Sequence, residues 1–133
     1  TVVLVHDAAR PLTPPQVIAR VIDAVRAGAG AVIPVLPVTD TLKTVDAAGV
    51  VVDTPRRSDM VAVQTPQGFR WDVLIRAHEA GASLGADEAR AATDDAGLVE
   101  AIGGSVQTVA GAERSMKVTR PLDLALAQIL IAE

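Results

Sequence analysis

The sequence predicts an α/β fold, in which helices pack against a sheet and a β-hairpin protrudes from it. Three observations carry this prediction: strand-like and helix-like stretches alternate along the chain, one segment has a clear amphipathic helical pattern, and another has the strand–turn–strand pattern of a hairpin. The length of 133 residues is that of one compact unit. Half the residues are hydrophobic and the mean hydropathy is +0.35, so the composition excludes a disordered chain and places the apolar excess in a core or an interface.

The first part of the chain predicts a strand, a helix and a second strand. Residues 1–5 are a β-branched run without alternation, which is typical of a strand buried on both faces of a parallel sheet. Thr13 is expected to cap a helix over 14–26, which opens with two prolines and carries its valines and isoleucines on one face. Residues 31–38 are again apolar, but two prolines remove ladder donors there and indicate an edge or a bulge.

The hairpin is predicted over 41–54, where two apolar stretches flank a turn at 46–49. An isolated hairpin is marginal in water, so its apolar side chains need a surface to pack on. The last helix has only Asp123 and Gln128 as interior polar residues, and we expect it to be buried nearly all round. Further strands are predicted over 60–64, 106–109 and 115–118. Further helices are predicted over 71–80, from Asp94 or Asp95 to Ile102, and over 121–132, with a loop around Gly85.

Charge and composition exclude several classes of function. The formal net charge is −4 and the basic residues are scattered, so no basic patch for nucleic acid is predicted. No apolar run approaches the ~20 residues that a membrane helix needs. Without cysteine there is neither a disulfide nor thiol catalysis. The chain starts on Thr1 and enters a strand with no leader before it; we therefore expect a cytoplasmic protein, of which this chain is a part cut in its middle.

Five short motifs carry the functional interpretation. In the first, VHDAARP at 5–11, Asp7 follows a strand directly, at the end where open α/β sheets bind ligands, and an aspartate there can hold Mg²⁺. The others are DTLK at 40–43, QTPQGF at 64–69, TDD at 93–95 and MKVTRP at 116–121. With all five in this order, the chain resembles the 2-C-methyl-D-erythritol 4-phosphate cytidylyltransferases of non-mevalonate isoprenoid biosynthesis.

The resemblance implies a Rossmann-like nucleotidyltransferase sheet with a protruding β-hairpin arm at about 39–58. Residues 1–133 would be the C-terminal part of one such domain. The family's Gly-rich loop, which binds CTP, is not among them, so this chain alone is expected to be inactive. In the family the arm reaches into the neighbouring subunit, which implies a homodimer.

The resemblance also assigns residues to the site. Asp7 would lie near Mg²⁺ and the erythritol phosphate, with Arg10 beside it. Thr65, Thr93 and Lys117 would surround the substrate phosphate, with Lys117 as the principal cation; Lys117 and Asp7 are the candidate catalytic residues. On the arm the implied substrate-binding residues are Thr41 and Arg57, although the adjacent Arg56 leaves a one-residue ambiguity.

These residue types suit a phosphoryl-transfer site that needs no covalent nucleophile. The phosphate of the acceptor attacks CTP and expels pyrophosphate, so the protein must position the reactants and neutralise charge. Each residue also has an ordinary structural interpretation: Asp7 as a turn cap, Lys117 as a solvated charge, the threonines in turns, and Asp94 and Asp95 at a helix N-terminus. Two alternatives stay open, a ribitol 5-phosphate cytidylyltransferase and a non-catalytic dimerisation fragment.

Overall fold

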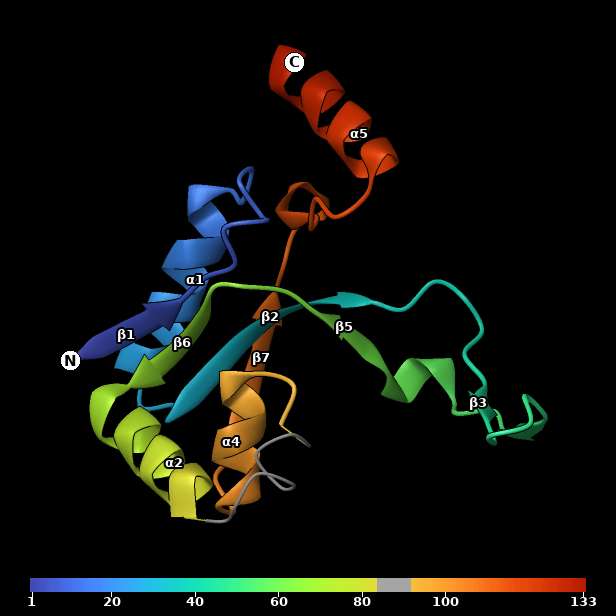
Figure 1. Ribbon diagram of the computed structural model, residues 1–133. Helices are drawn as coiled ribbons and strands as arrows, with labels where there is room; N and C mark the ends of the chain where they lie inside the picture. The colour runs from blue at the N-terminus through green and yellow to red at the C-terminus, as the bar shows by residue number, and fades with distance from the viewer. Residues whose placement is uncertain (84–91) are drawn as a thin grey trace.

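In the computed structural model, which describes residues 1–83 and 92–133, helices cover both faces of a five-stranded sheet (Figure 1). Helix α1 (Pro15–Arg26) lies on one face, and α2 (Trp71–Ser83) with α4 (Asp95–Ala101) lies on the other. This confirms the predicted α/β class. The loop predicted around Gly85 lies outside the described residues.

Strand β2 (Ala31–Pro37) is the centre of the sheet. On one side it pairs in parallel with β7 (Val106–Ala110), and on the other it pairs antiparallel with β6 (Gln67–Arg70) and then with β5 (Val61–Val63). Strand β6, a short strand within the QTPQGF motif, was not predicted from the sequence, and neither was its pairing with the first strand.

Strand β1 (Val2–Val5) pairs antiparallel with β6, so the expectation of a parallel strand buried on both faces was wrong. Its side chains are half-buried or exposed, because β6 is its only partner among the described strands. An apolar run without alternation therefore does not establish burial on both faces.

Pro34 does not push β2 to an edge, contrary to expectation. It is fully buried and lies where the antiparallel partner of β2 changes, between Val32 opposite Gly68 and Val35 opposite Val63. Its carbonyl accepts a hydrogen bond from the Gln64 N–H at 2.8 Å. Proline has no N–H group to donate. Because Pro34 lies where the partner of β2 changes from β6 to β5, the sheet does not need a donor at this position.

Helix α1 packs on the sheet through the apolar face predicted for it. Val17, Val21 and Val25 are buried, and each such side chain contributes about 1.5–3 kcal/mol of burial free energy. Gly68 of β6 permits this contact, because a Cβ there would lie 2.4 Å from Val21 Cγ1. Thr13 does not cap the helix; its hydroxyl donates instead to the Arg10 carbonyl at 3.2 Å.

The opposite face of the sheet is covered by α2 and α4 around Phe69, which is fully buried. The side chains that surround it come from β2, α2 and α4: Ala31, Val73, Leu74, Ala77 and Val99. Trp71, at the start of α2, is more than half exposed and does not belong to this core.

The predicted hairpin is confirmed, with β3 (Thr44–Val45) and β4 (Val51–Asp53) extending away from the sheet (Figure 1). The Asp46 carboxylate accepts hydrogen bonds from the N–H groups of Ala48 and Val50, and Gly49 takes the positive φ of +80° that the turn needs. A 3₁₀ turn at Arg57–Asp59 leads the chain back to β5. We call residues 39–58 the arm.

Two expectations for the C-terminal region were wrong. Residues 115–118 do not form a strand, because a 3₁₀ turn at Glu113–Ser115 ends the extended run after β7. Helix α5 (Pro121–Ala132) is not buried: only Ala127 is, while Leu122 is 78% exposed and Ile131 is 68% exposed. Figure 1 shows α5 projecting from the sheet, so the described elements leave its apolar sides uncovered. None of the described helices combines the length and apolarity needed to cross a membrane.

Candidate functional site

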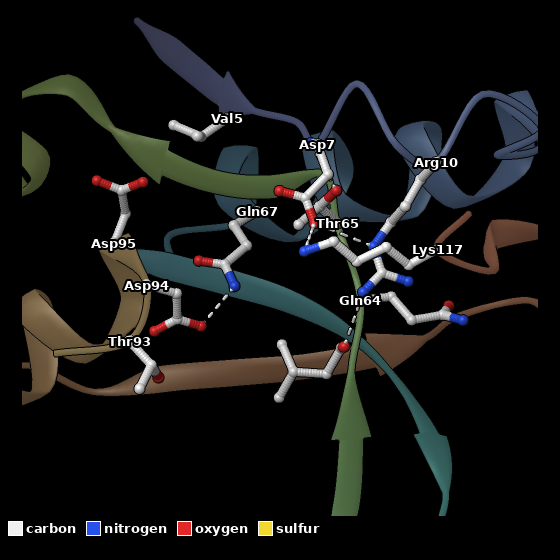
Figure 2. A pocket seen from close by; sticks show the side chains of 11 residues that line it. Val5, Asp7, Arg10, Gln64, Thr65, Gln67, Thr93, Asp94, Asp95 and Lys117 are labelled. Atoms are coloured by element: carbon white, nitrogen blue, oxygen red, sulfur yellow. Dashed lines mark hydrogen bonds and ion pairs between the residues drawn. The ribbon is translucent and has the colours of Figure 1, made fainter. Parts of the chain in front are cut away.

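A pocket of about 330 Å³ lies at the carboxyl end of β1, between the loop that follows this strand and the start of α4. Asp7, Arg10 and Lys117 gather on one side of it, and Thr93, Asp94 and Asp95 lie on the other (Figure 2). The remaining lining residues are Val5, Val63, Gln64, Thr65 and Gln67. The fold therefore brings together five residues that the sequence analysis selected: Asp7, Arg10, Thr65, Thr93 and Lys117.

Asp7 connects the two cations of the pocket. Its Oδ2 lies 3.3 Å from Arg10 Nε and 3.4 Å from Lys117 Nζ. Two positive charges around one carboxylate leave a surplus positive charge, which favours an incoming anion. This side of the pocket is therefore suited to a phosphate group, while Asp94 and Asp95 make the opposite side acidic.

Arg10 and Lys117 differ in how firmly they are held. The Arg10 side chain is 12% exposed, and its Nη1 donates to the Ser115 carbonyl at 2.7 Å. The Lys117 side chain is 49% exposed, and Asp7 is the only ion-pair partner it has within the described residues. Arg10 is thus a fixed charge, whereas Lys117 can turn toward a ligand.

Thr65 and Asp94 shape the two sides of the pocket. The Thr65 hydroxyl accepts the Asp7 N–H at 3.0 Å and lies 2.8 Å from His6 Nδ1, which holds the loop after β1. Asp94 caps α4, since its Oδ1 accepts the Gly97 N–H at 2.8 Å, as the sequence predicted for a helix N-terminus. Thr93 directly precedes Asp94, so the cap of α4 also places Thr93 at the pocket.

The comparisons with known proteins agree with this geometry. The sequence model of the family described as 2-C-methyl-D-erythritol 4-phosphate cytidylyltransferase matches residues 1–133. The chain belongs to this family. A relative of that name from Rhodococcus jostii is 56% identical over 131 residues, 98% of this chain and 55% of its own length. One from Frankia casuarinae is 58% identical over 132 residues, 99% of this chain and 47% of its own length.

Solved structures of the 2-C-methyl-D-erythritol 4-phosphate cytidylyltransferase family have the same fold. The crystal structure of the Thermus thermophilus enzyme has a TM-score of 0.85 at 40% identity, covering 99% of this chain and 62% of that one. The 4-diphosphocytidyl-2C-methyl-D-erythritol synthase from Anaerococcus prevotii has a TM-score of 0.87 at 28% identity, covering 99% of this chain and 59% of that one. The chain spans about half the length of the curated relatives it matches.

Two residues expected in the site of this family member, Thr41 and Arg57, do not line the pocket. Thr41 is exposed on the arm, and Arg57 donates to the Thr39 carbonyl at 2.9 Å near the base of the arm. The neighbouring Arg56 forms an exposed ion pair with Asp59 at 3.0 Å. Neither arginine is among the residues that line the pocket with Asp7 and Lys117.

The residues of the pocket would supply only part of a Mg²⁺ site. The described part of this family member has no group of three or more histidine, aspartate or glutamate side chains that could by itself hold a metal ion. Both cations contact Oδ2 of Asp7, and within the described residues its Oδ1 makes no hydrogen bond or ion pair. Mg²⁺ is commonly held by one or two carboxylates together with substrate phosphates. The donor set fits a metal that arrives with a phosphate ligand.

Sequence reasoning missed Gln64 and Gln67, which flank Thr65 and Pro66 in the QTPQGF motif. Both side chains are buried, at 5% and 3% exposure, and both line the pocket. Gln67 Nε2 donates to Asp94 Oδ2 at 2.7 Å, and its Oε1 accepts the Ala96 N–H at 3.1 Å (Figure 2). The available signal was a pair of glutamines next to apolar strands, where a buried amide must find partners.

Two carboxylates outside the pocket have lowered pKa values. The side-chain hydrogen bond from Arg70 lowers the pKa of Asp72 at the start of α2. The backbone N–H groups of Thr119 and Arg120 lower the pKa of Asp123, because they stabilise its ionised form. The same two hydrogen bonds hold the turn between Lys117 and α5.

Proposed function

We propose that the full-length protein, meaning this chain with the additional length that its relatives carry, transfers a cytidylyl group from CTP to 2-C-methyl-D-erythritol 4-phosphate. The products are the CDP-alcohol and pyrophosphate, and the reaction belongs to non-mevalonate isoprenoid precursor biosynthesis. Family membership over residues 1–133 supports this proposal. The observation that carries it is the Arg10–Asp7–Lys117 cluster, which offers a surplus positive charge to an acceptor phosphate.

In the proposed reaction, a phosphate oxygen of the acceptor attacks the α-phosphorus of CTP. The new P–O bond forms as the bond to pyrophosphate breaks, and no residue of the chain becomes covalently modified. Lys117 turns from Asp7 to the acceptor phosphate, while Arg10 stays paired with Asp7 and the Ser115 carbonyl. The Thr65 and Thr93 hydroxyls supply neutral polar contacts beside this charge.

Mg²⁺ is part of the same proposal. When bound to a triphosphate, it neutralises charge on the phosphate oxygens. Asp7 Oδ1 would be the ligand that this chain contributes, because Oδ2 faces the two cations. The CTP-binding Gly-rich loop of the family has no counterpart in this sequence, so we expect turnover only from the full-length protein.

The arm is proposed to make a homodimer and to present Thr41 and Arg57 to the pocket of the neighbouring subunit. Its exposed valines, and the absence of Thr41 and Arg57 from the pocket of their own chain, support this arrangement. The proposal includes a cytoplasmic location and no nucleic-acid or membrane partner.

The experiment that tests the function is Lys117→Ala in the full-length protein. Losing one charge-assisted contact to the acceptor phosphate costs about 1.5–3 kcal/mol, on the order of 10- to 100-fold in the KM of the polyol phosphate. The KM of CTP is expected to change little. The matched control, Arg76→Ala, removes an exposed cation of α2 outside the pocket and leaves both constants unchanged.

Equal losses in both KM values would contradict the assignment of Lys117 to the acceptor. Assays of the unsubstituted protein with ribitol 5-phosphate in place of the erythritol phosphate identify the acceptor. Higher kcat/KM for ribitol 5-phosphate would replace the proposed substrate, and no turnover with either would leave a dimerisation role.

A further inference from the structure

Gln64 holds the start of the segment that carries Lys117. Its Nε2 donates to the Ala112 carbonyl at 2.9 Å, and its Oε1 accepts the Ala112 N–H at 3.1 Å. A single side-chain amide thus pairs with both backbone groups of one residue, as a neighbouring strand would. Because Gln64 is 5% exposed, neither partner could be replaced freely by water.

Gly111 is shaped to admit this amide. A Cβ at this position would lie 2.3 Å from Gln64 Oε1 and 3.1 Å from the Val35 carbonyl oxygen. The glycine therefore has a steric reason to lie directly before Ala112. This close approach is independent of the two hydrogen bonds. It shows that the residue next to Ala112 leaves room for the Gln64 side chain.

A short segment with further hydrogen bonds connects Ala112 to Lys117. The Ala112 carbonyl also accepts the Ser115 N–H at 3.0 Å, which closes the 3₁₀ turn, and the Ser115 carbonyl accepts Arg10 Nη1 at 2.7 Å. The Val118 N–H then donates to the Ala9 carbonyl at 2.7 Å. Lys117 lies in the chain between the hydrogen-bonded residues Ser115 and Val118, and its Nζ points to Asp7.

We propose that Gln64 is a positioning residue for Lys117. It fixes the first residue of the 112–118 segment against the sheet, so that the lysine emerges beside Asp7 and Arg10. Gln64 does not touch the acceptor phosphate in this role. We call the two hydrogen bonds between Gln64 and Ala112 the clamp. The inference rests on the proposed function only for the identity of the acceptor, whereas the clamp rests on the contacts of Gln64.

The test compares Gln64→Leu with Gln107→Leu in the full-length protein. Gln107 is exposed on β7, so its substitution is a matched loss of one amide outside the pocket. Gln64→Leu is expected to raise the KM of the polyol phosphate about tenfold and to leave that of CTP within twofold. Gln107→Leu is expected to leave both unchanged.

A double-mutant cycle with Lys117→Ala decides whether Gln64 acts through the lysine. When Lys117 is already absent, Gln64→Leu is expected to change the KM of the polyol phosphate by less than twofold. A tenfold loss in both backgrounds would overturn the proposal, because Gln64 would then support the fold or another residue.

Gln64→Glu keeps the proposal testable if the leucine variant does not fold. A protonated carboxyl can donate to the Ala112 carbonyl and accept its N–H, as the amide does, whereas a carboxylate cannot donate. The defect relative to the unsubstituted protein should therefore shrink as the pH falls. A defect that is constant with pH would contradict the clamp.

Binding of inorganic phosphate separates this inference from the proposed reaction. Its Kd, measured by titration without turnover, should show the same non-additive pattern over the four members of the cycle. Non-additive phosphate binding in a protein that transfers no cytidylyl group would retain the clamp and reject the function. Additive effects in an active enzyme would retain the function and reject the clamp.

Discussion

The pocket and the arm place their candidate residues in opposite situations. In the pocket, Asp7 and Lys117 come from opposite ends of the sequence and lie 3.4 Å apart within one chain. On the arm, Thr41 is exposed, and within the described residues the Arg57 guanidinium has one hydrogen bond, to the Thr39 carbonyl at the base of the arm. The pocket residues have partners from distant parts of the chain, whereas the arm residues have only local ones.

This difference shows which parts of the proposed site one chain can build. The pocket is held by the sheet and by buried amides of the same chain. The arm is a short two-stranded ribbon with exposed apolar side chains, including Val45 and Val52, and such a ribbon is marginal without a surface to cover it. The second subunit that we propose would provide such a surface.

The largest effect is expected from deleting residues 43–53 in the full-length protein. The deletion removes the apolar ribbon, so the mass measured by light scattering should fall from that of a dimer to that of a monomer. Turnover should be lost with it, because Thr41 and Arg57 could no longer reach a neighbouring pocket. The hairpin variant Val45→Thr/Val50→Thr/Val52→Thr keeps the turn and should also be monomeric. A deletion variant that stays dimeric would contradict the role of the arm.

A smaller effect is expected from Asp7→Asn, which tests the pocket alone. The change keeps the shape of the side chain and removes the charge that organises Arg10 and Lys117, so kcat should fall about tenfold, or ~1.4 kcal/mol. Raising the Mg²⁺ concentration should restore part of the loss. Stability should fall by only about 0–1 kcal/mol, because the Asp7 side chain is partly exposed.

The control for Asp7→Asn is Asp72→Asn, which breaks an exposed ion pair with Arg70 outside the pocket and should leave kcat unchanged. Thermal unfolding and Mg²⁺ dependence are measured on the same samples. A clearly lower Tm with unchanged turnover per folded molecule would make Asp7 a turn-capping residue and remove it from the site.

The smallest effect is expected at Asp123, beyond the pocket. The N–H groups of Thr119 and Arg120 lower the pKa of this carboxyl in the folded protein, so it contributes stability above the ordinary carboxyl pKa of about 3.9. This contribution is lost as the pH falls through the lowered folded pKa. The Tm difference between the unsubstituted protein and Asp123→Asn should therefore be present at neutral pH and vanish in strong acid. Asp23→Asn, an exposed change on α1, is the control, and a difference independent of pH would show that these N–H groups do not stabilise the ionised carboxylate.

Sequence predicted the pocket better than it predicted the sheet. Motif order identified Asp7, Arg10, Thr65, Thr93 and Lys117, and the fold brings them together. The antiparallel pairing of β1 was missed, because a strand of four residues such as β6 carries too little periodicity to be recognised. Helix α5 shows the other limit: its composition predicts a buried helix, but composition does not say which surface covers it.

Gln64 and Gln67 were missed for a related reason. A glutamine beside a strand is usually solvated, and only the three-dimensional structure shows that these two amides are buried against Ala112 and Asp94. Thr41 and Arg57 show the reverse case. The motifs point to both residues, but neither lines the pocket of its own chain, so their proposed role has to be measured in the proposed dimer.

That role is tested most directly by mixing two impaired full-length proteins, one with Lys117→Ala and one with Arg57→Ala. If each site combines Lys117 of one subunit with Arg57 of its neighbour, a mixed dimer has one site with both changes and one intact site. Random exchange of subunits should then restore activity at about a quarter of all sites. If Arg57 served the pocket of its own chain, every site would keep one defect. Activity that does not rise above the average of the two separate variants would contradict the account of the arm.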